Sequence, residues 1–323
     1  MTASRRPLLF TLALFAVFAT LPAVFALTGW TGGMGLATRI LIYATAVVAL
    51  DLIIGYGAMV SFGHAMFFGV GGYAVAVVAH HTGLGEMPFG GSNAALVVWP
   101  IAIVVCGLLG FVVGWLALKT SGVQFIMITL AFAQMVFFLL VSVQSWGGDD
   151  GMMIDRRNTL PFVDIGRPTT FYYVCLAVLV MWFAFCRMLV NSRFGLVLQA
   201  LRQSERRAVN LGIAPLSFRL ATFVTSAMGT GLAGVLWANY ARFVSPDMAA
   251  WTKSGEFMAM VVLGGLGTLV GPIVGAAAFV GLEEVLSTWT QHWMIVMGPL
   301  LVIVALYRRR GLVGSFLGGD RAH

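Results

Sequence analysis

Charged residues are scarce in this chain of 323 residues. They make up 10% of it, whereas hydrophobic residues make up 60% and the mean hydropathy is +0.94. Soluble domains carry about a quarter charged residues, so this composition indicates an integral membrane protein. Only 146–168 and 191–219 hold enough polar sequence to fold outside a bilayer, which excludes a large soluble domain. We therefore expect a single polytopic membrane domain over residues 1–323.

Cysteines and catalytic groupings are also scarce. The three cysteines, Cys106, Cys175 and Cys186, lie in separate apolar runs, so we expect them to pack and to form no disulfide framework. No G-x-x-x-x-G-K-[ST] sequence occurs, so the chain cannot bind ATP through a P-loop. No His or Cys pair has metal-ligand spacing, since His80 and His81 are adjacent. The sequence thus predicts no enzyme, no metal site and no cofactor in this chain.

Apolar runs of the length that crosses a bilayer, about 20 residues, follow one another along the chain. They predict an all-α fold of about ten transmembrane helices, near 8–27, 36–56, 61–80, 94–118, 122–144, 170–190, 218–240, 253–271, 272–289 and 291–307. The first run could also be a cleaved signal peptide, but the spans that follow at once favour an uncleaved helix. After residue 250 the sequence does not define the number or the bounds of the spans.

The net charge of +7 is better explained by orientation in the membrane than by a nucleic-acid partner, because Lys and Arg collect on the cytoplasmic side. A cytoplasmic N-terminus puts thirteen positive residues on that side: Arg5, Arg6, Lys119, Arg187, Arg193, Arg202, Arg206, Arg207, Arg219, Arg308, Arg309, Arg310 and Arg321. Six fall on the other side or at its boundary: Arg39, Arg156, Arg157, Arg167, Arg242 and Lys253. An even number of spans then predicts that both termini are cytoplasmic.

One polar stretch, 193–213, has the spacing of an amphipathic helix. Its apolar residues share one face, at steps of three and four: Phe194, Val197, Leu198, Leu201, Ala208 and Leu211. Gly212 and Pro215 provide a helix stop. Two interpretations stay open, a basic helix lying on anionic lipid and a helix that docks on a cytoplasmic partner.

Several motifs occur in the order found in one transporter family. "SERRAVNLGI" resembles the cytoplasmic motif of ABC-importer permeases, with Glu205, Ala208 and Gly212 matching and Arg207 replacing a usual alanine. "GYGAMVSFGHAMFFGVGGY", "ITLAFAQMV", "GGDDGM", "AMVVLGGLGTLVGPIVGA" and "LYRRRGLVG" resemble motifs of the branched-chain amino-acid permeases. Together they cover roughly residues 50–314, and the long cytoplasmic segment points to the M-type (LivM-type) of the two permease subunits.

This resemblance implies an importer subunit in the bacterial inner membrane that takes up branched-chain or related amino acids. A second permease, two cytoplasmic ATPase subunits that bind ATP and Mg, and a periplasmic binding protein would complete the assembly. Whether the second permease is a homologue or another copy stays open. Segment 193–213 would be the coupling helix, and its candidate contact residues are Arg202, Glu205, Arg206, Arg207, Ala208 and Gly212. Alternatives are a stand-alone ion-coupled transporter using Asp51 or Glu283 and Glu284, or a permease of the same family for urea, short amides or aromatic acids.

Polar residues within the predicted spans are candidates for a solute pathway, because an ionisable group in hydrocarbon is costly unless it faces protein or water. The candidates are Asp51, Ser61, His64 and Gln134, together with Asp149 and Asp150 in the outer loop. Their alternative roles are interhelical hydrogen bonds within the spans and an ordinary acidic turn in the loop. Asp51, Met59, Gln134 and Asp150 depart from the family pattern, which leaves the solute open.

Small residues recur every fourth position in the third predicted span. Gly57, Ser61, Ala65 and Gly69 would form one ridge along a helix and allow close approach of a neighbour. Gly71 and Gly72 would then loosen or break that helix in its middle. We expect a tightly packed segment, with a break, beside the solute pathway.

Overall fold

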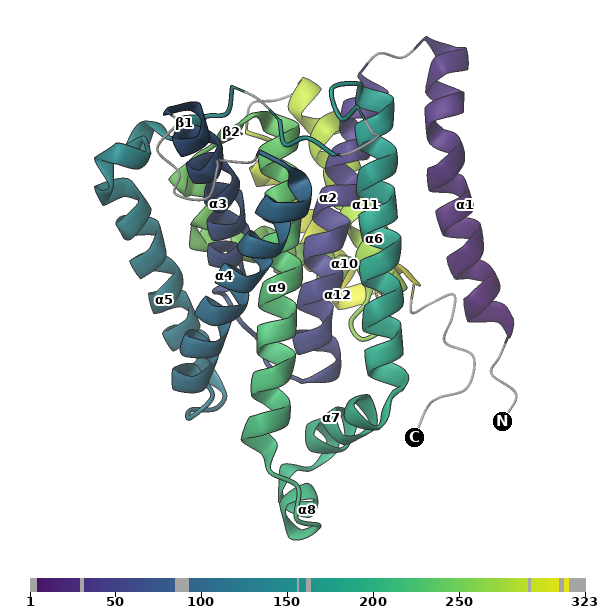
Figure 1. The fold of residues 1–323 in the computed structure, drawn as a ribbon. Helices are drawn as coiled ribbons and strands as arrows, with labels where there is room; N and C mark the ends of the chain where they lie inside the picture. The colour runs from purple at the N-terminus through teal and green to yellow at the C-terminus, as the bar shows by residue number, and fades with distance from the viewer. Residues whose placement is uncertain are drawn as a thin grey trace.

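A computed structural model describes residues 5–29, 32–84, 93–155, 157–160, 164–289, 292–307 and 311–313. Its long helices run side by side in one bundle (Figure 1): α1 (Arg5–Thr28), α2 (Gly33–Asp51), α3 (His64–Leu84), α4 (Ala95–Ala117), α5 (Val123–Ser142), α6 (Pro168–Asn191), α9 (Pro215–Ala241) and α11 (Val270–Trp289). Shorter helices are α7 (Arg193–Gln203), α8 (Glu205–Asn210), α10 (Trp251–Gly264) and α12 (Trp293–Tyr307). The predicted all-α membrane fold is confirmed.

The structure does not confirm the predicted count of about ten spans. Eight helices in the described part of the chain are long and apolar enough to span a membrane. α10 has 14 residues, which at 1.5 Å per residue is about 21 Å, against a hydrocarbon core of about 30 Å. The predicted span 253–271 is wrong after residue 264, because a turn at 265–269 follows α10 and α11 then starts. α12, with 15 residues, is likewise short.

α7 and α8 project beyond the bundle, and we call that end the α8 end (Figure 1). α1 also starts there, and Gly311 lies against Gly265 in the turn after α10. The arginines after α12 on which the predicted orientation rests, Arg308–Arg310 and Arg321, lie outside the described residues, so the cytoplasmic location of both termini stays a prediction.

α2 is the centre of the bundle. Every residue from 40 to 55 is buried, and α2 packs against α6, α9, α10 and α11. A helix that is apolar all round must be enclosed by others, which explains this position. By contrast, α1, α4 and α5 expose large apolar side chains such as Leu12, Leu108 and Met127, as suits contact with lipid.

At the end opposite α8, short segments tie the loops together. β1 (Met152–Met153) pairs antiparallel with β2 (Phe243–Val244), with Met152 opposite Val244. Nearby, the Asn158 backbone N–H donates to the Asn239 side chain over 2.9 Å. These bonds hold the loop after α5 against the end of α9.

Glycines bring α3 and α9 into backbone contact. A Cβ on Gly71 would collide with the carbonyl of Gly231, and one on Gly234 would collide with the carbonyl of Phe68. Gly71 and Gly72 are therefore packing residues inside an unbroken α3, contrary to the prediction of a break there.

The predicted ridge of small residues does not continue as one helical face. Gly57 and Ser61 precede α3, and only Ala65 and Gly69 lie on it. Gly69 packs against Ala249 in the 3-10 turn η4 (Pro246–Ala249) rather than against a long helix. The helical conformation is interrupted at 57–63, ahead of Gly71 and Gly72, where the glycine pattern predicts the break.

Gly71→Ala should lower the free energy of unfolding by about 1–3 kcal/mol, since the added methyl overpacks the contact between α3 and α9. The measurement is the midpoint of thermal unfolding in detergent. Gly281→Ala is the matched control, because within the described structure an added Cβ there meets no atom outside its own helix within 4 Å. Equal midpoints for the two variants would contradict the close approach.

Candidate functional site

The chain unwinds between α2 and α3. After α2 comes the π-helical turn η1 (Leu52–Tyr56), then a non-helical stretch at 57–63. The Ile53 carbonyl accepts from the N–H groups of Gly57 and Met59, over 3.0 and 3.1 Å, and Ala58 has a φ of 53°. Within a membrane, irregular backbone is tolerated only where it packs in protein or lines a cavity. We therefore take residues 52–63, which we call the unwound segment, as the starting point of the candidate site.

Ser61 and His64 lie where the unwound segment ends, and His64 contacts α9. Both are fully buried, and the Ser61 hydroxyl lies 3.0 Å from Nδ1 of His64. The imidazole packs edge-on against Phe67 and Phe223, with ring centroids 5.4 and 5.3 Å apart. His64 thus contacts a neighbouring helix, which is the alternative role that its sequence position allows. Its Nε2 is buried and has no hydrogen-bond partner among the described residues.

Asp51 fastens the end of α2 to the turn between α10 and α11. Its carboxylate is fully buried and accepts the backbone N–H of Gly267 over 2.7 Å and that of Leu269 over 3.1 Å. An ionised acceptor strengthens such bonds, and a buried carboxylate needs them. The pathway candidate Asp51 therefore has a structural role as the cap of this turn.

α7 reaches the same place through Arg202. The Arg202 guanidinium donates to the carbonyl of Gly55 in the π-helical turn. Gly55 also packs so tightly that a Cβ would collide with the Asp51 carboxylate and the Gly267 backbone. Gly55 of the unwound segment thus contacts both α7 and the turn before α11.

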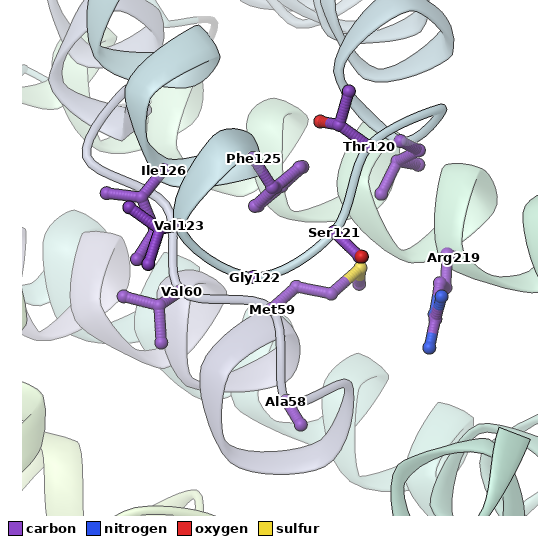
Figure 2. Close-up of a pocket in the computed structure, with 11 residues that line it drawn as sticks. Ala58, Met59, Val60, Thr120, Ser121, Gly122, Val123, Phe125, Ile126 and Arg219 are labelled. Carbon is purple, nitrogen blue, oxygen red and sulfur yellow. The ribbon is translucent and has the colours of Figure 1, made fainter.

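A cavity of about 270 Å³ lies beside the unwound segment, at the turn between α4 and α5. Figure 2 shows Val60, Val123 and Ile126 grouped on one side of it and the Arg219 guanidinium on the other. Arg219 makes a two-point ion pair with Glu205, over 2.9 and 3.2 Å. The wall of this cavity is therefore connected to α8.

The segment predicted as one amphipathic helix, 193–213, is two helices that meet at Ser204. The Ser204 hydroxyl accepts from the N–H of Arg207 and caps α8, as Ser192 caps α7. The single-helix prediction is wrong for this reason. α8 ends at Asn210 with Leu211 as its C-cap, and Gly212 follows with a φ of 82° while the Ile213 N–H donates to the Ala208 carbonyl.

The break changes which residues face outward. Ala208 is buried, as expected, but Leu211 is 81% exposed and Val209 is 48% exposed. Arg206 and Arg207 are exposed beside them. α8 therefore presents a surface that is both apolar and basic beyond the end of the bundle, and we call Arg206, Arg207, Val209 and Leu211 the α8 surface.

The remaining pathway candidates do not join this group. Gln134 is half-buried on α5. Asp149 and Asp150 are exposed in the 3-10 turn η3 (Gly148–Asp150), which follows α5 at the end opposite α8. The structure does not bring the six candidates together in one pocket.

Two cations, Arg39 and Lys253, form three ion pairs with carboxylates of the bundle. Arg39 on α2 binds Glu283 over 2.9 Å and Glu284 over 3.2 Å, and Lys253 binds Glu256 over 2.6 Å. Lys253 and Glu256 are three residues apart on α10, a spacing that brings two side chains together on one helical face. The pairing of Arg39 has a weaker signal, an arginine near the start of one span and two glutamates near the end of another.

The bundle, its lipid-suited outer faces and its unwound, cavity-lining segment define a membrane-embedded permease domain of a transporter. The sequence model of the family "Branched-chain amino acid transport system / permease component" matches residues 32–305, and the chain belongs to this family. It is a multi-pass inner-membrane protein of the ABC-transporter class, and no solved structure matches it.

Curated relatives agree with this membership. The high-affinity branched-chain amino acid transport system permease protein LivM of Salmonella typhimurium is 28% identical, over 87% of this chain and 70% of its own length. The probable LivM of Methanocaldococcus jannaschii is 23% identical, over 84% of this chain and 90% of its own. LivH of Escherichia coli is 30% identical over a shorter stretch, 38% of this chain and 40% of its own.

Asp51→Ala should destabilise the protein, because it leaves the buried N–H groups of Gly267 and Leu269 without their acceptor, at about 1–3 kcal/mol for each. The measurement is the thermal unfolding midpoint in detergent. Asp149→Ala is the matched control, since Asp149 is exposed. If both variants unfold at the wild-type temperature, Asp51 does not hold the turn.

Proposed function

We propose that this chain is the membrane-spanning subunit of an ATP-binding-cassette importer that takes up branched-chain or related amino acids. A periplasmic binding protein would deliver the solute, and separate subunits would hydrolyse ATP. The observation that carries this proposal is the α8 surface, in which Leu211 is 81% exposed at the end of a helix that projects from a permease of this family. A solvent-exposed apolar side chain with arginines nearby, as Leu211 has in Arg206 and Arg207, is typical of a surface that a partner covers.

The relatives support a pair of permeases. LivM and LivH are both named as permease proteins of one transport system, and this chain is similar to both. We propose that a second permease subunit encloses the solute path together with this chain. ATP and Mg²⁺ would be bound by the partner ATPases, because the chain has no P-loop sequence.

The coupling would run through two contacts at the α8 end. Closure of the ATPases on ATP would move α8, and the ion pair between Glu205 and Arg219 would pass that movement to the first turns of α9. Arg202 would pass it to Gly55 and so to the turn held by Asp51. Both routes meet at the unwound segment, which is the part of the bundle best able to change conformation without breaking a helix.

An ion-coupled transporter is the alternative of another class. It would need carboxylates inside the membrane that can exchange a proton or cation. Asp51 is engaged by two backbone N–H groups, Glu283 and Glu284 by Arg39, and Glu256 by Lys253. These partners favour structural roles for the four carboxylates and hence the importer.

Leu211→Asp should abolish copurification of the ATPase subunits, because it puts a charge in the middle of the α8 surface. Met153→Asp, at an 81% exposed position in β1 at the end opposite α8, is the matched control and should leave copurification unchanged. Glu205→Arg should also release the ATPases, since it places like charges at Glu205 and Arg219.

The measurement is the ATPase content of the complex after affinity purification through this chain. Full ATPase content in Leu211→Asp would overturn the docking role of α8. Uptake of solute by this chain alone in proteoliposomes without ATP would overturn the importer itself.

Arg202→Gln should leave the ATPases bound but lower the number of solute molecules moved per ATP hydrolysed, because the contact between α7 and Gly55 is lost. Arg206→Gln is the control for copurification. It removes the same charge from the α8 surface, of which Arg202 is not part, so only Arg206→Gln should reduce the amount of bound ATPase. Transport and hydrolysis are measured together in proteoliposomes. An unchanged ratio in Arg202→Gln would show that this contact carries no coupling.

A further inference from the structure

A second cavity, of about 360 Å³, opens between α3, α9, α10 and the segment that joins α9 to α10. Its volume is within the range of about 300–1,000 Å³ that is usual for small-molecule sites. Three charged residues line it, Asp247, Lys253 and Glu256, and its aromatic walls are Phe68, Trp237 and Phe243.

The charges in the wall retain binding capacity. Lys253 Nζ lies 2.6 Å from Glu256 Oε2, and the side chains are 27% and 21% exposed. A lysine ammonium has three N–H donors and a carboxylate has about four acceptor positions, so one mutual bond leaves capacity on both. Asp247, exposed in η4, adds a second carboxylate. Ionisable residues that face a cavity inside a membrane domain mark sites of solute contact.

The aromatic wall is a preformed cluster. Trp237 stacks with Tyr43 at 5.2 Å between ring centroids and lies 6.2 Å from Phe68, which in turn packs edge-on against Phe257 at 5.3 Å. Interlocked rings of this kind have little freedom to move. They provide a rigid apolar surface next to the charged groups.

The cavity is also connected to the unwound segment. The Ser254 hydroxyl, next to Lys253 on α10, accepts the backbone N–H of Ala65 in the first turn of α3, over 2.9 Å. Ala249, two residues after Asp247, packs against Gly69 of α3. A change in the first turns of α3 therefore moves the walls of this cavity.

We propose that this cavity is a binding site for a zwitterionic amino acid with an apolar side chain. Lys253 binds the α-carboxylate, Glu256 and Asp247 receive the α-ammonium group, and Trp237 and Phe243 contact the side chain. The fully buried Phe68 supports Trp237 from behind. The proposal rests on the proposed import function and names the chemistry that the permease itself recognises. An uncharged solute such as urea offers neither a carboxylate for Lys253 nor an ammonium group for Glu256 and Asp247, so these charges disfavour it.

The test uses the assembled complex of both permeases and both ATPases, without the binding protein, in lipid nanodiscs. The probe is radiolabelled L-leucine, with L-leucinamide, which lacks the carboxylate, and N-acetyl-L-leucine, which lacks the ammonium group, as competitors. Wild type should bind L-leucine, and both competitors should be weaker by about tenfold or more, as expected for loss of a charge-assisted hydrogen bond.

Lys253→Gln should weaken L-leucine binding by a similar factor of about ten and remove the discrimination against L-leucinamide. Lys119→Gln is the matched control, because Lys119 lies over Trp115 at the end of α4, away from the cavity. The charge exchange Lys253→Glu with Glu256→Lys separates binding from folding. It restores an ion pair, so a merely structural pair would return binding to the wild-type level, whereas a ligand site would stay impaired.

The proposal is overturned if wild type does not bind L-leucine, if Lys253→Gln binds it normally, or if the charge exchange restores binding. ATP-driven uptake by the wild-type complex with its binding protein is measured in parallel. If the wild-type complex takes up solute and the KM of Lys253→Gln equals the wild-type KM, this site is refuted and the import function stands. Absence of ATP-driven uptake refutes the import function instead.

Discussion

One buried carboxylate holds the α8 end of the bundle together. The Asp51 carboxylate accepts hydrogen bonds from two backbone N–H groups of the turn after α10, which take the place of bonds to water. Without these two bonds, burial of the charge would be too costly. The same contact presses Gly55 onto Gly267, and Arg202 completes it from outside the bundle. Three segments far apart in the chain are thus fixed at the point where α2 stops being regular. The unwound segment can exist because its start is held so firmly.

The positions of the helices follow from the sequence because each needs an apolar run of sufficient length. The break at 57–63 does not, since Gly57, Ser61, Ala65 and Gly69 keep a helical spacing across it. Two bonds replace helical ones at the end of the break: a local bond between Ser61 and His64, and a tertiary bond in which Ser254 accepts the N–H of Ala65. Periodicity detects which residues can pack closely, but not which backbone bonds a neighbour will replace.

The candidate site was predicted in the same uneven way. Glu205, Ala208 and Gly212 were placed in the coupling segment from a motif, and Gly212 does follow the end of a helix there. The exposure of Leu211 was missed, because the periodicity of one helix was carried across the cap at Ser204. The cavity at Lys253 was missed for another reason. Its walls come from α3, α9 and α10, and nothing in a single sequence brings those residues together.

The two cavities lie against opposite parts of one short stretch of chain. Ala58, Met59 and Val60 line the cavity near α8, while Ala65 and Gly69 contact the elements that carry Asp247 and Lys253. Because packed helices are stiff, a conformational change is least costly where the backbone is already irregular. A shift of 57–63 would therefore alter both cavities together. Such a linkage is what alternating access requires, and here it needs no helix of the bundle to unfold.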